Sequence, residues 1–323
     1  MPDIHFFAAC LYAFVVSTIL VYVFAATALR NLCVDRPNDR SSHEQPTPRC
    51  GGVGVLFGAV SAVAFLDLPA PLANIMWLAA ALFAVSLFDD FLHLPPLIRL
   101  CAHAAASLTA ALVLGLSWSA WLVVVTIGLM WMTNLYNFMD GSDALAGAMG
   151  VIGFAAYAVG ALVAGDFAFA QVCACLSAAT LGFLIWNWPP ARIFLGDGGA
   201  IPLGFLAGTL GYYGYAKGDW SIAFPLLVFL PFIADASVTL VHRAIRQRNL
   251  LQAHRGHFYQ RVLTAHGWTK TELATLSAVV MLLSAGCALI FARGANLTGI
   301  IALTAALVTM GLAAFGLERK ARS

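Results

Sequence analysis

Long apolar segments alternate with short polar ones along the whole chain. Apolar runs of about 18 or more residues recur, and a helix of that length crosses the ~30 Å hydrocarbon core of a bilayer. A β-barrel would need ~10-residue strands of alternating polarity instead. The pattern predicts eleven membrane spans, with approximate bounds at residues 6–29, 51–66, 70–88, 98–116, 118–134, 144–164, 168–186, 200–216, 221–242, 272–292 and 295–315.

Composition agrees with this pattern. Hydrophobic residues make up 61% of the chain and charged residues 10%, against ~25% charged residues in soluble domains. The first apolar run follows Asp3 and His5 and lacks a basic leader, so we interpret it as a retained span rather than a signal peptide. We expect an all-α, polytopic membrane helix bundle of about 10–11 transmembrane helices, and a single domain over residues 1–323.

The basic residues predict the orientation of the spans. If the N-terminus lies outside, 15 of the 17 Lys and Arg residues are cytoplasmic, and only Lys217 and Arg293 are not. Arg246 and Arg248 are then ordinary topology charges. The C-terminus is expected in the cytoplasm, and the predicted cytoplasmic loops are residues 30–50, 88–99, 134–143, 187–199 and 243–271.

Cysteine usage and net charge add little. The seven cysteines are scattered. Cys173 and Cys175 have apolar neighbours, which favours small core residues over a metal site. A net charge of +2 gives no reason to expect a nucleic-acid partner.

Acidic and amide side chains gather in the predicted cytoplasmic loops. "FDDFLHLPPLIRL" contains Asp89 and Asp90 at a helix end, with Arg99 ten residues after the first of them. "NLYNFMDGSDALAG" spaces four oxygen-bearing side chains three residues apart, so that on a helix they would fan across one side. These four are Asn134, Asn137, Asp140 and Asp143.

Two later loops add to this set. "FLGDGGA" puts Asp197 between glycines just before a span, where the backbone can approach an anion closely. Asp197 could instead be only a helix N-cap. "AHRGHFYQR" offers His254, Arg255, His257 and Arg261.

The chemistry of these loops points to metal-assisted phosphate transfer. Carboxylate and amide oxygens without a matching Cys/His set suit Mg²⁺ or Mn²⁺ rather than Zn²⁺. Arg and His beside such a site suit phosphate groups. We expect phosphoryl or nucleotide-diphosphate chemistry at the cytoplasmic membrane surface.

The ordered set of motifs resembles the polyprenyl-phosphate N-acetylhexosamine-1-phosphate transferases, of the glycosyltransferase family 4 type. The set comprises "DRPNDRSSHEQPTPRCGGVG", the Asp pair, the Asn/Asp block, "FLGDGGA" and the His/Arg loop. The sequence "HRGH", in place of a His-rich triplet, is more similar to the O-antigen and exopolysaccharide initiators. "DDFLH" departs from the relatives that have a third acid, since His93 stands at that position.

The resemblance implies a reaction. UDP-N-acetylhexosamine and undecaprenyl phosphate would give undecaprenyl-diphospho-N-acetylhexosamine and UMP, after the lipid phosphate attacks the β-phosphorus. The enzyme would lie in the bacterial inner membrane with its active site facing the cytoplasm, and would start a surface glycan such as lipopolysaccharide.

The resemblance also implies roles for the acidic and amide residues. Asp197 would be the principal Mg²⁺ ligand, with Asn137 beside it. Asp89 and Asp90, with no preference between them, would position or deprotonate the lipid phosphate or support the metal. Asp140 and Asn134 would brace the site.

The remaining roles concern the donor. Asp143 would contact the uracil edge, with Phe194 either stacking on the base or packing in the protein. The diphosphate and sugar would be held by Arg99, His254, Arg255 and His257, although Arg99 could be only a topology anchor. The first loop, with His43 and Arg49, is expected to wall the nucleotide pocket.

Two other classes of protein were weighed. A transporter or flippase should carry polar residues near the bilayer midplane, and only Asp235 qualifies; we expect Asp235 to brace the bundle. An enzyme using a CDP-activated alcohol should have Ala-Arg after Asp-Gly, which "DGSDALAG" lacks. The sequence leaves open which HexNAc is used, which glycan is built, and whether the protein is a homodimer.

Overall fold

The structure is a computed structural model that describes residues 4–27, 29, 33–35, 46–92, 94–246, 256–265 and 267–292. Within them, twelve helices and a short antiparallel ribbon form. They are α1 (Ile4–Ala26), β1 (Val34–Asp35), β2 (Thr47–Pro48), α2 (Gly51–Val63), α3 (Ala70–Leu92), α4 (Pro96–Val113), α5 (Ala120–Phe138), α6 (Leu145–Ala164), α7 (Phe167–Asn187), α8 (Asp197–Lys217), α9 (Ala223–Val228), α10 (Leu230–Ile245), α11 (Phe258–Ala265) and α12 (Lys270–Phe291).

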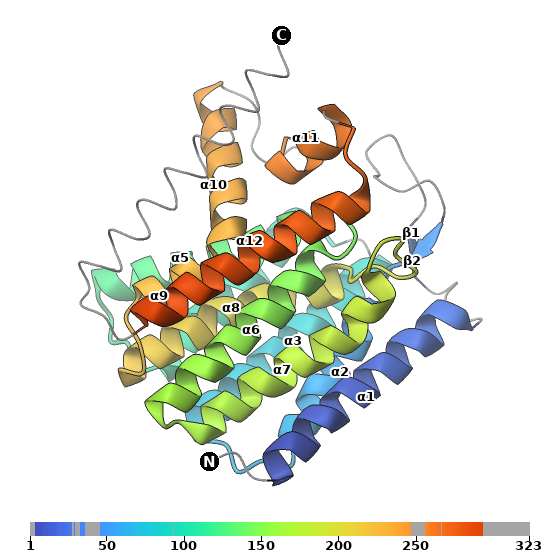
Figure 1. The fold of residues 1–323 in the computed structure, drawn as a ribbon. Helices are drawn as coiled ribbons and strands as arrows, with labels where there is room; N and C mark the ends of the chain where they lie inside the picture. The colour runs from blue at the N-terminus through green and yellow to red at the C-terminus, as the bar shows by residue number, and fades with distance from the viewer. Residues whose placement is uncertain are drawn as a thin grey trace.

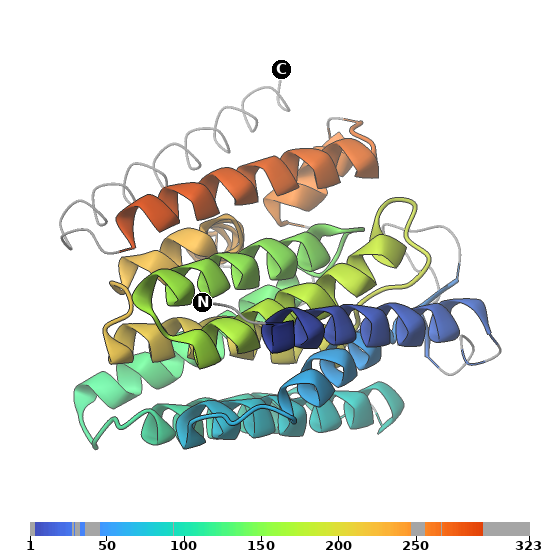
Figure 2. The same ribbon diagram turned by 60° about the horizontal axis from the view of Figure 1, so that its bottom comes forward.

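Most of the long helices lie side by side in a bundle (Figures 1 and 2). Helix α7 packs against α6, α1 and α2, whereas α8 packs against α3 and α5. Helix α8 is buried along most of its length. A Cβ at Gly204 would lie 2.7 Å from the Tyr136 Cβ, so glycine lets α8 and α5 approach closely. This packing fixes α8, and therefore Asp197 at its first residue.

The prediction of an all-α polytopic membrane protein is confirmed. Among the described residues, seven helices are long and apolar enough to cross a bilayer: α1, α3, α4, α5, α6, α7 and α12. Helix α2, with 13 residues, is shorter. The predicted span at residues 295–315 lies outside the described residues, and the orientation of the termini stays a prediction.

The expectation of one continuous span over residues 221–242 is wrong. The chain forms α9 and α10 there, and Phe229 is the C-cap of the first and the N-cap of the second. Pro231, in the first turn of α10, has no N–H with which to continue the preceding helix. Helix α10 then departs from the common direction of the long helices (Figures 1 and 2).

Candidate active site

One guanidinium links two of the predicted catalytic carboxylates. The Arg99 Nη1 atom, on α4, lies 3.1 Å from Oδ2 of Asp89 at the end of α3 and 3.6 Å from Oδ2 of Asp197 at the start of α8. Oδ1 of Asp89 accepts a hydrogen bond of 2.7 Å from the Leu94 N–H, which fixes this carboxylate in the turn between α3 and α4. The turn between α3 and α4 therefore meets the start of α8, which lies far from it in the sequence.

The end of α5 and the turn that follows it join this group. The Asn137 side chain lies close enough to the Asp197 carboxylate to lower its pKa. The Gly196 backbone, immediately before Asp197, lies close enough to the Asp140 carboxylate to lower its pKa. Helix α5 ends at Phe138, so Asp140 lies in a turn and the expected fan of four side chains on one helix is wrong beyond Asn137.

The charges of neighbouring aspartates raise the pKa values of Asp197 and Asp140. Burial raises the pKa of Asp197 and the charge of Asp89 adds to the rise, whereas Arg49, Arg99 and the Asn137 amide lower it. Burial also raises the pKa of Asp140, and the nearby charge of Asp197 raises it further. A cation placed between the carboxylates of Asp140 and Asp197 would stabilise both in their ionised forms.

The oxygen atoms of this cluster fit a hard divalent cation. Mg²⁺ typically binds one or two protein carboxylates and keeps several waters, and Asp197, Asn137 and Asp140 supply such a set. Within the described residues there is no group of three or more His, Cys, Asp or Glu side chains placed to hold a metal. Protein atoms surround the Asp197 carboxylate on most sides. Because 31% of its side chain is still exposed, a ligand can reach it.

Asp197 is not an N-cap. The N-cap of α8 is Gly196, and no side chain caps the helix by a hydrogen bond. Asp197 is instead the first helical residue, where the positive end of the helix dipole favours its ionised form. The alternative in which Asp197 serves only as a cap is therefore wrong.

The end of the first loop lies against the segment before Asp197. Phe194 N–H donates to the Pro48 carbonyl at 2.8 Å, and Gly51 N–H and Gly52 N–H donate to the Phe194 and Leu195 carbonyls, both at 2.9 Å. This places the motif "PRCGG" beside "FLGDGG".

Glycines make this approach possible. A Cβ at Gly52 would lie 2.3 Å from the backbone nitrogen of Gly199. Gly196 has φ +74°, and a Cβ there would lie 2.2 Å from the Arg49 carbonyl oxygen. Any side chain at these positions would push the first loop away from the turn that carries Asp197.

Asp143 is fully engaged by protein groups. Its Oδ1 lies 2.8 Å from Nζ of Lys270, the first residue of α12, and its Oδ2 accepts the Ala191 N–H at 3.1 Å. Its side chain is 3% exposed. Asp143 therefore links the turn before α6 to two other segments, and a contact between Asp143 and uracil stays a prediction.

Asn187 forms a second link between the same segments. Its Oδ1 accepts the Ala144 N–H at 2.9 Å, and its Nδ2 donates to the Ile193 carbonyl at 2.9 Å. Ala144 has φ 64°, a left-handed conformation that costs energy for a residue with a Cβ. The Asn187 hydrogen bond helps to hold this strained turn, and with it the position of Asp140 and Asp143.

Asn134 lies one turn deeper in the bundle. Its Oδ1 is 3.2 Å from Nδ1 of His103, and its Nδ2 donates to the Met130 carbonyl at 2.7 Å. His103 follows Arg99 by four residues on α4, so the two share a helix face. Asn134 thus braces α4 against α5, and its support of the site stays a prediction.

The other predicted residues are placed less fully. Phe194 is half-buried and its backbone pairs with the first loop, which leaves both stacking and packing open. The backbone of Asp90 belongs to α3, but its side chain lies outside the described part of the structure, as do His254 and Arg255 entirely.

His257 is buried beside Asp235. Its Nδ1 lies 3.3 Å from Oδ1 of that aspartate, which also accepts hydrogen bonds from the start of α11. Asp235 therefore braces the protein, as expected. A direct contact between His257 and substrate stays a prediction.

Three residues near the site were given no role by the sequence alone: His103, Asn187 and Lys270. Asn187 could have been noticed, because it is an isolated amide between an apolar run and a Pro-Pro pair. Lys270 is indistinguishable in sequence from a topology charge. His103 occurs within an apolar span, where a buried ionisable residue is a functional candidate by default.

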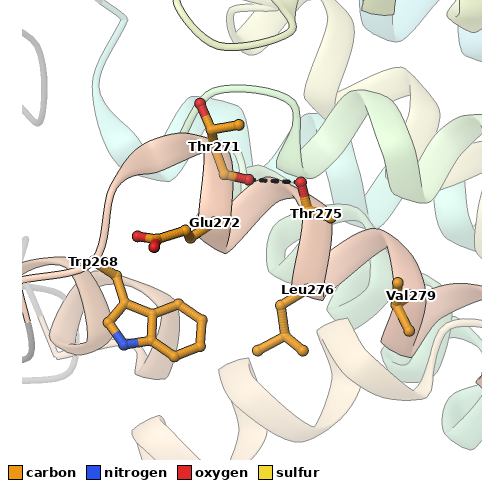
Figure 3. A pocket seen from close by; sticks show the side chains of 6 residues that line it. All are labelled: Trp268, Thr271, Glu272, Thr275, Leu276 and Val279. Carbon is orange, nitrogen blue, oxygen red and sulfur yellow. Dashed lines mark hydrogen bonds between the residues drawn. The ribbon is translucent and has the colours of Figure 1, made fainter.

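A separate groove of about 410 Å³ runs along one face of α12 (Figure 3). It is lined by Trp268, Thr271, Glu272, Thr275, Leu276 and Val279. The Thr275 hydroxyl donates to the Thr271 carbonyl of its own helix at 2.8 Å, and none of the predicted site residues lines the groove. We therefore locate the candidate active site at the Asp89–Asp197 cluster and not here.

Comparison with known proteins supports the family resemblance that the sequence motifs indicate. Residues 72–215 match glycosyl transferase family 4. A "Probable undecaprenyl-phosphate N-acetylglucosaminyl 1-phosphate transferase" of Bacillus subtilis is 26% identical over 276 residues, covering 78% of this chain and 76% of the relative.

Two further relatives have similar names. A decaprenyl-phosphate N-acetylglucosaminephosphotransferase of Mycolicibacterium smegmatis is 29% identical, over 73% of this chain and 70% of the relative. A phospho-N-acetylmuramoyl-pentapeptide-transferase of Staphylococcus aureus is 27% identical, over 51% of this chain and 50% of the relative. These matches confirm the resemblance to the polyprenyl-phosphate HexNAc-1-phosphate transferase family that the ordered motifs indicated.

Proposed function

We propose that this relative of the polyprenyl-phosphate HexNAc-1-phosphate transferases joins HexNAc-1-phosphate from a UDP-N-acetylhexosamine to undecaprenyl phosphate. The products would be undecaprenyl-diphospho-HexNAc and UMP. The reaction would begin a surface glycan at the inner membrane, with the active site facing the cytoplasm.

The observation that carries this proposal is the Arg99 bridge between Asp89 and Asp197. A guanidinium beside two carboxylates, together with Asn137 and Asp140, combines anion-binding and cation-binding groups in one cluster. Transfer between two phosphate esters needs such a mixture, because both reactants are anions and would otherwise repel each other.

The residues can be given roles from their positions. Arg99 would bind phosphate oxygens and hold the Asp89 carboxylate in place for the incoming lipid phosphate. Asp197, Asn137 and Asp140 would hold Mg²⁺, which when bound neutralises charge on the transferring phosphoryl group. The links made by Asp143 and Asn187 would keep the turn that carries Asp140 in place.

A transport function gains no support from Asp235, the one residue that favoured it. Both of its oxygens accept backbone hydrogen bonds from α11. This carboxylate is occupied in bracing the protein and does not line a path through it.

Purified protein tests the proposal directly. With Mg²⁺, undecaprenyl phosphate and a panel of UDP-HexNAc donors, it should release UMP, and EDTA should stop the release. Asp197→Asn should lower turnover by about two orders of magnitude or more, because an anionic metal ligand is lost.

The matched control is Asp67→Asn. Asp67 is an exposed acid in the turn between α2 and α3, and its loss should leave turnover unchanged. No UMP release with any donor would overturn the proposed function. Near-normal turnover of Asp197→Asn would remove Asp197 from the site.

A further inference from the structure

Asp235 supplies the N-terminal cap of a helix to which it does not belong. It lies on α10, and its Oδ1 and Oδ2 accept the N–H groups of Phe258 and Tyr259 at 2.8 and 3.1 Å. The Thr239 hydroxyl donates to the same carboxylate at 3.2 Å. A charged cap that satisfies the free N–H groups of α11 ties this short helix firmly to α10.

Tyr259 ties α11 to the candidate active site. Its side chain is 3% exposed, and its hydroxyl donates to the Phe138 carbonyl at 3.3 Å, at the end of α5. Burial raises the pKa of this phenol, and the charges of Asp235 and Asp140 add to the rise. The hydroxyl therefore stays protonated and available as a donor.

Gly141 provides the space that Tyr259 occupies. A Cβ at position 141 would lie 2.1 Å from the Tyr259 hydroxyl oxygen and 3.2 Å from its Cζ. Gly141 is not among the glycines with positive φ, so alanine would fit the backbone there. The tyrosine hydroxyl is thus the main obstacle to a side chain at this position.

His257 is held within the same contact. Its ring is 6.2 Å from the Phe138 ring and 5.9 Å from the Tyr259 ring, centroid to centroid, and the latter pair is stacked. Its Nδ1 lies 3.3 Å from Oδ1 of Asp235. The position of His257 relative to Asp140 and Gly141 therefore depends on how α11 is seated.

We propose that Asp235 and Tyr259 are positioning residues, which seat α11 on the Asp140–Asp143 turn and thereby fix His257 beside the reaction site. This role rests on the proposed function. Asp235 anchors α11 from outside the site, and Tyr259 sets its register against Gly141. Neither residue needs to touch substrate, and both would act through the geometry of that turn.

A double-variant cycle tests the seating. Gly141→Ala should displace α11 and lower kcat/KM by about tenfold or more, because small displacements of positioning groups are costly in catalysis. Tyr259→Phe alone should lower it only a few-fold. The combined variant should recover most of the loss caused by Gly141→Ala, because the atom that the new Cβ would meet is removed. Additive losses without rescue would mean that the contact between Gly141 and Tyr259 does not set the position of α11.

A second readout does not depend on activity. Tryptic cleavage after Arg261, within α11, should be faster in Asp235→Asn and in Gly141→Ala than in the wild type. The combined Gly141→Ala and Tyr259→Phe variant should return toward the wild-type cleavage rate.

The matched control is Asp166→Asn. Asp166 caps α7 by accepting the Phe169 N–H at 3.1 Å, at the opposite end of α6 from Asp143. It should change neither kcat/KM nor cleavage at Arg261.

The outcomes separate the two claims. If the wild type releases no UMP, the proposed function fails, and cleavage at Arg261 still decides whether Asp235 and Tyr259 seat α11. The positioning role is overturned if Gly141→Ala is fully active, if Tyr259→Phe gives no rescue, or if Asp235→Asn leaves cleavage after Arg261 unchanged.

Discussion

Arg99 is shared by two carboxylates, and its removal should be felt at both. Arg99→Gln leaves Asp89 and Asp197 without their common counter-charge, and their repulsion rises. We expect the KM for the UDP-sugar to rise about tenfold, because a phosphate-binding cation is lost. Arg99→Lys should retain part of the affinity, since an ammonium keeps the charge but lacks the planar fork. Steady-state UMP release measures both effects.

Arg192→Gln is the control for the substitution of Arg99. Arg192 is exposed and lies over the Trp186 ring, 5.5 Å from its centroid, in the loop that precedes Asp197. Its loss removes an equal charge from the same end of the protein without touching the two carboxylates. Equal effects of the Arg99 and Arg192 substitutions would mean that only overall charge matters and would contradict a specific role for Arg99.

At the scale of elements, the contact between the first loop and the start of α8 depends on glycine. Gly52→Ala places a Cβ 2.3 Å from the backbone nitrogen of Gly199, which cannot rotate away. The two segments must separate, at a cost of about 1–3 kcal/mol in the free energy of unfolding. Turnover should fall about tenfold or more as Asp197 moves. Thermal unfolding and UMP release measure the two effects.

Gly128→Ala is the matched control. Gly128 lies in α5, and a Cβ there would meet no atom within 4 Å. Alanine should leave turnover unchanged, because it adds helix propensity and strains nothing. A Gly52→Ala variant that behaves like Gly128→Ala would show that the first loop and α8 need not touch for activity.

Elements were predictable from sequence where local pattern decides them. Apolar runs located the long helices, and the motifs located Asp89, Asn137 and Asp197. The break at Phe229 was missed because the run from 221 to 242 is apolar on both sides of Pro231. Hydropathy alone does not record the missing N–H that ends α9.

Contacts between distant segments were not predictable in the same way. The hydrogen bond by which Asp235 caps Phe258 joins two residues that are 23 positions apart. The pair of Asp143 and Lys270 spans 127 positions. Each side chain has many possible partners in sequence, and only packing of the helices selects one. A sequence can therefore nominate candidate oxygen ligands for this site but not the residues that hold them in place.

At the scale of the whole molecule, the paired aspartates link stability to pH and, under the proposed function, to Mg²⁺. The pKa values of Asp140 and Asp197 are raised in the folded protein, chiefly by burial. Their contribution to stability is fully present below the ordinary Asp pKa of about 3.9 and is lost as pH rises through the folded-state values. Metal binding needs ionised carboxylates, so the Mg²⁺-induced rise in Tm should grow with increasing pH.

Asp140→Asn isolates this effect from the other titrating groups of the protein. Without Mg²⁺, the variant should be more stable than the wild type near neutral pH, and the difference in Tm should shrink as the pH falls, because protonated aspartate and asparagine are both neutral. With Mg²⁺, the variant should gain less than the wild type, since one ionised oxygen donor is gone. Thermal unfolding in detergent, from neutral to acidic pH and with and without Mg²⁺, measures the difference in Tm between the variant and the wild type. A wild type that becomes relatively more stable than Asp140→Asn as pH rises without metal would mean that Asp140 is stabilised as an anion by the protein itself. The turn after α5 would then have no need of a bound cation.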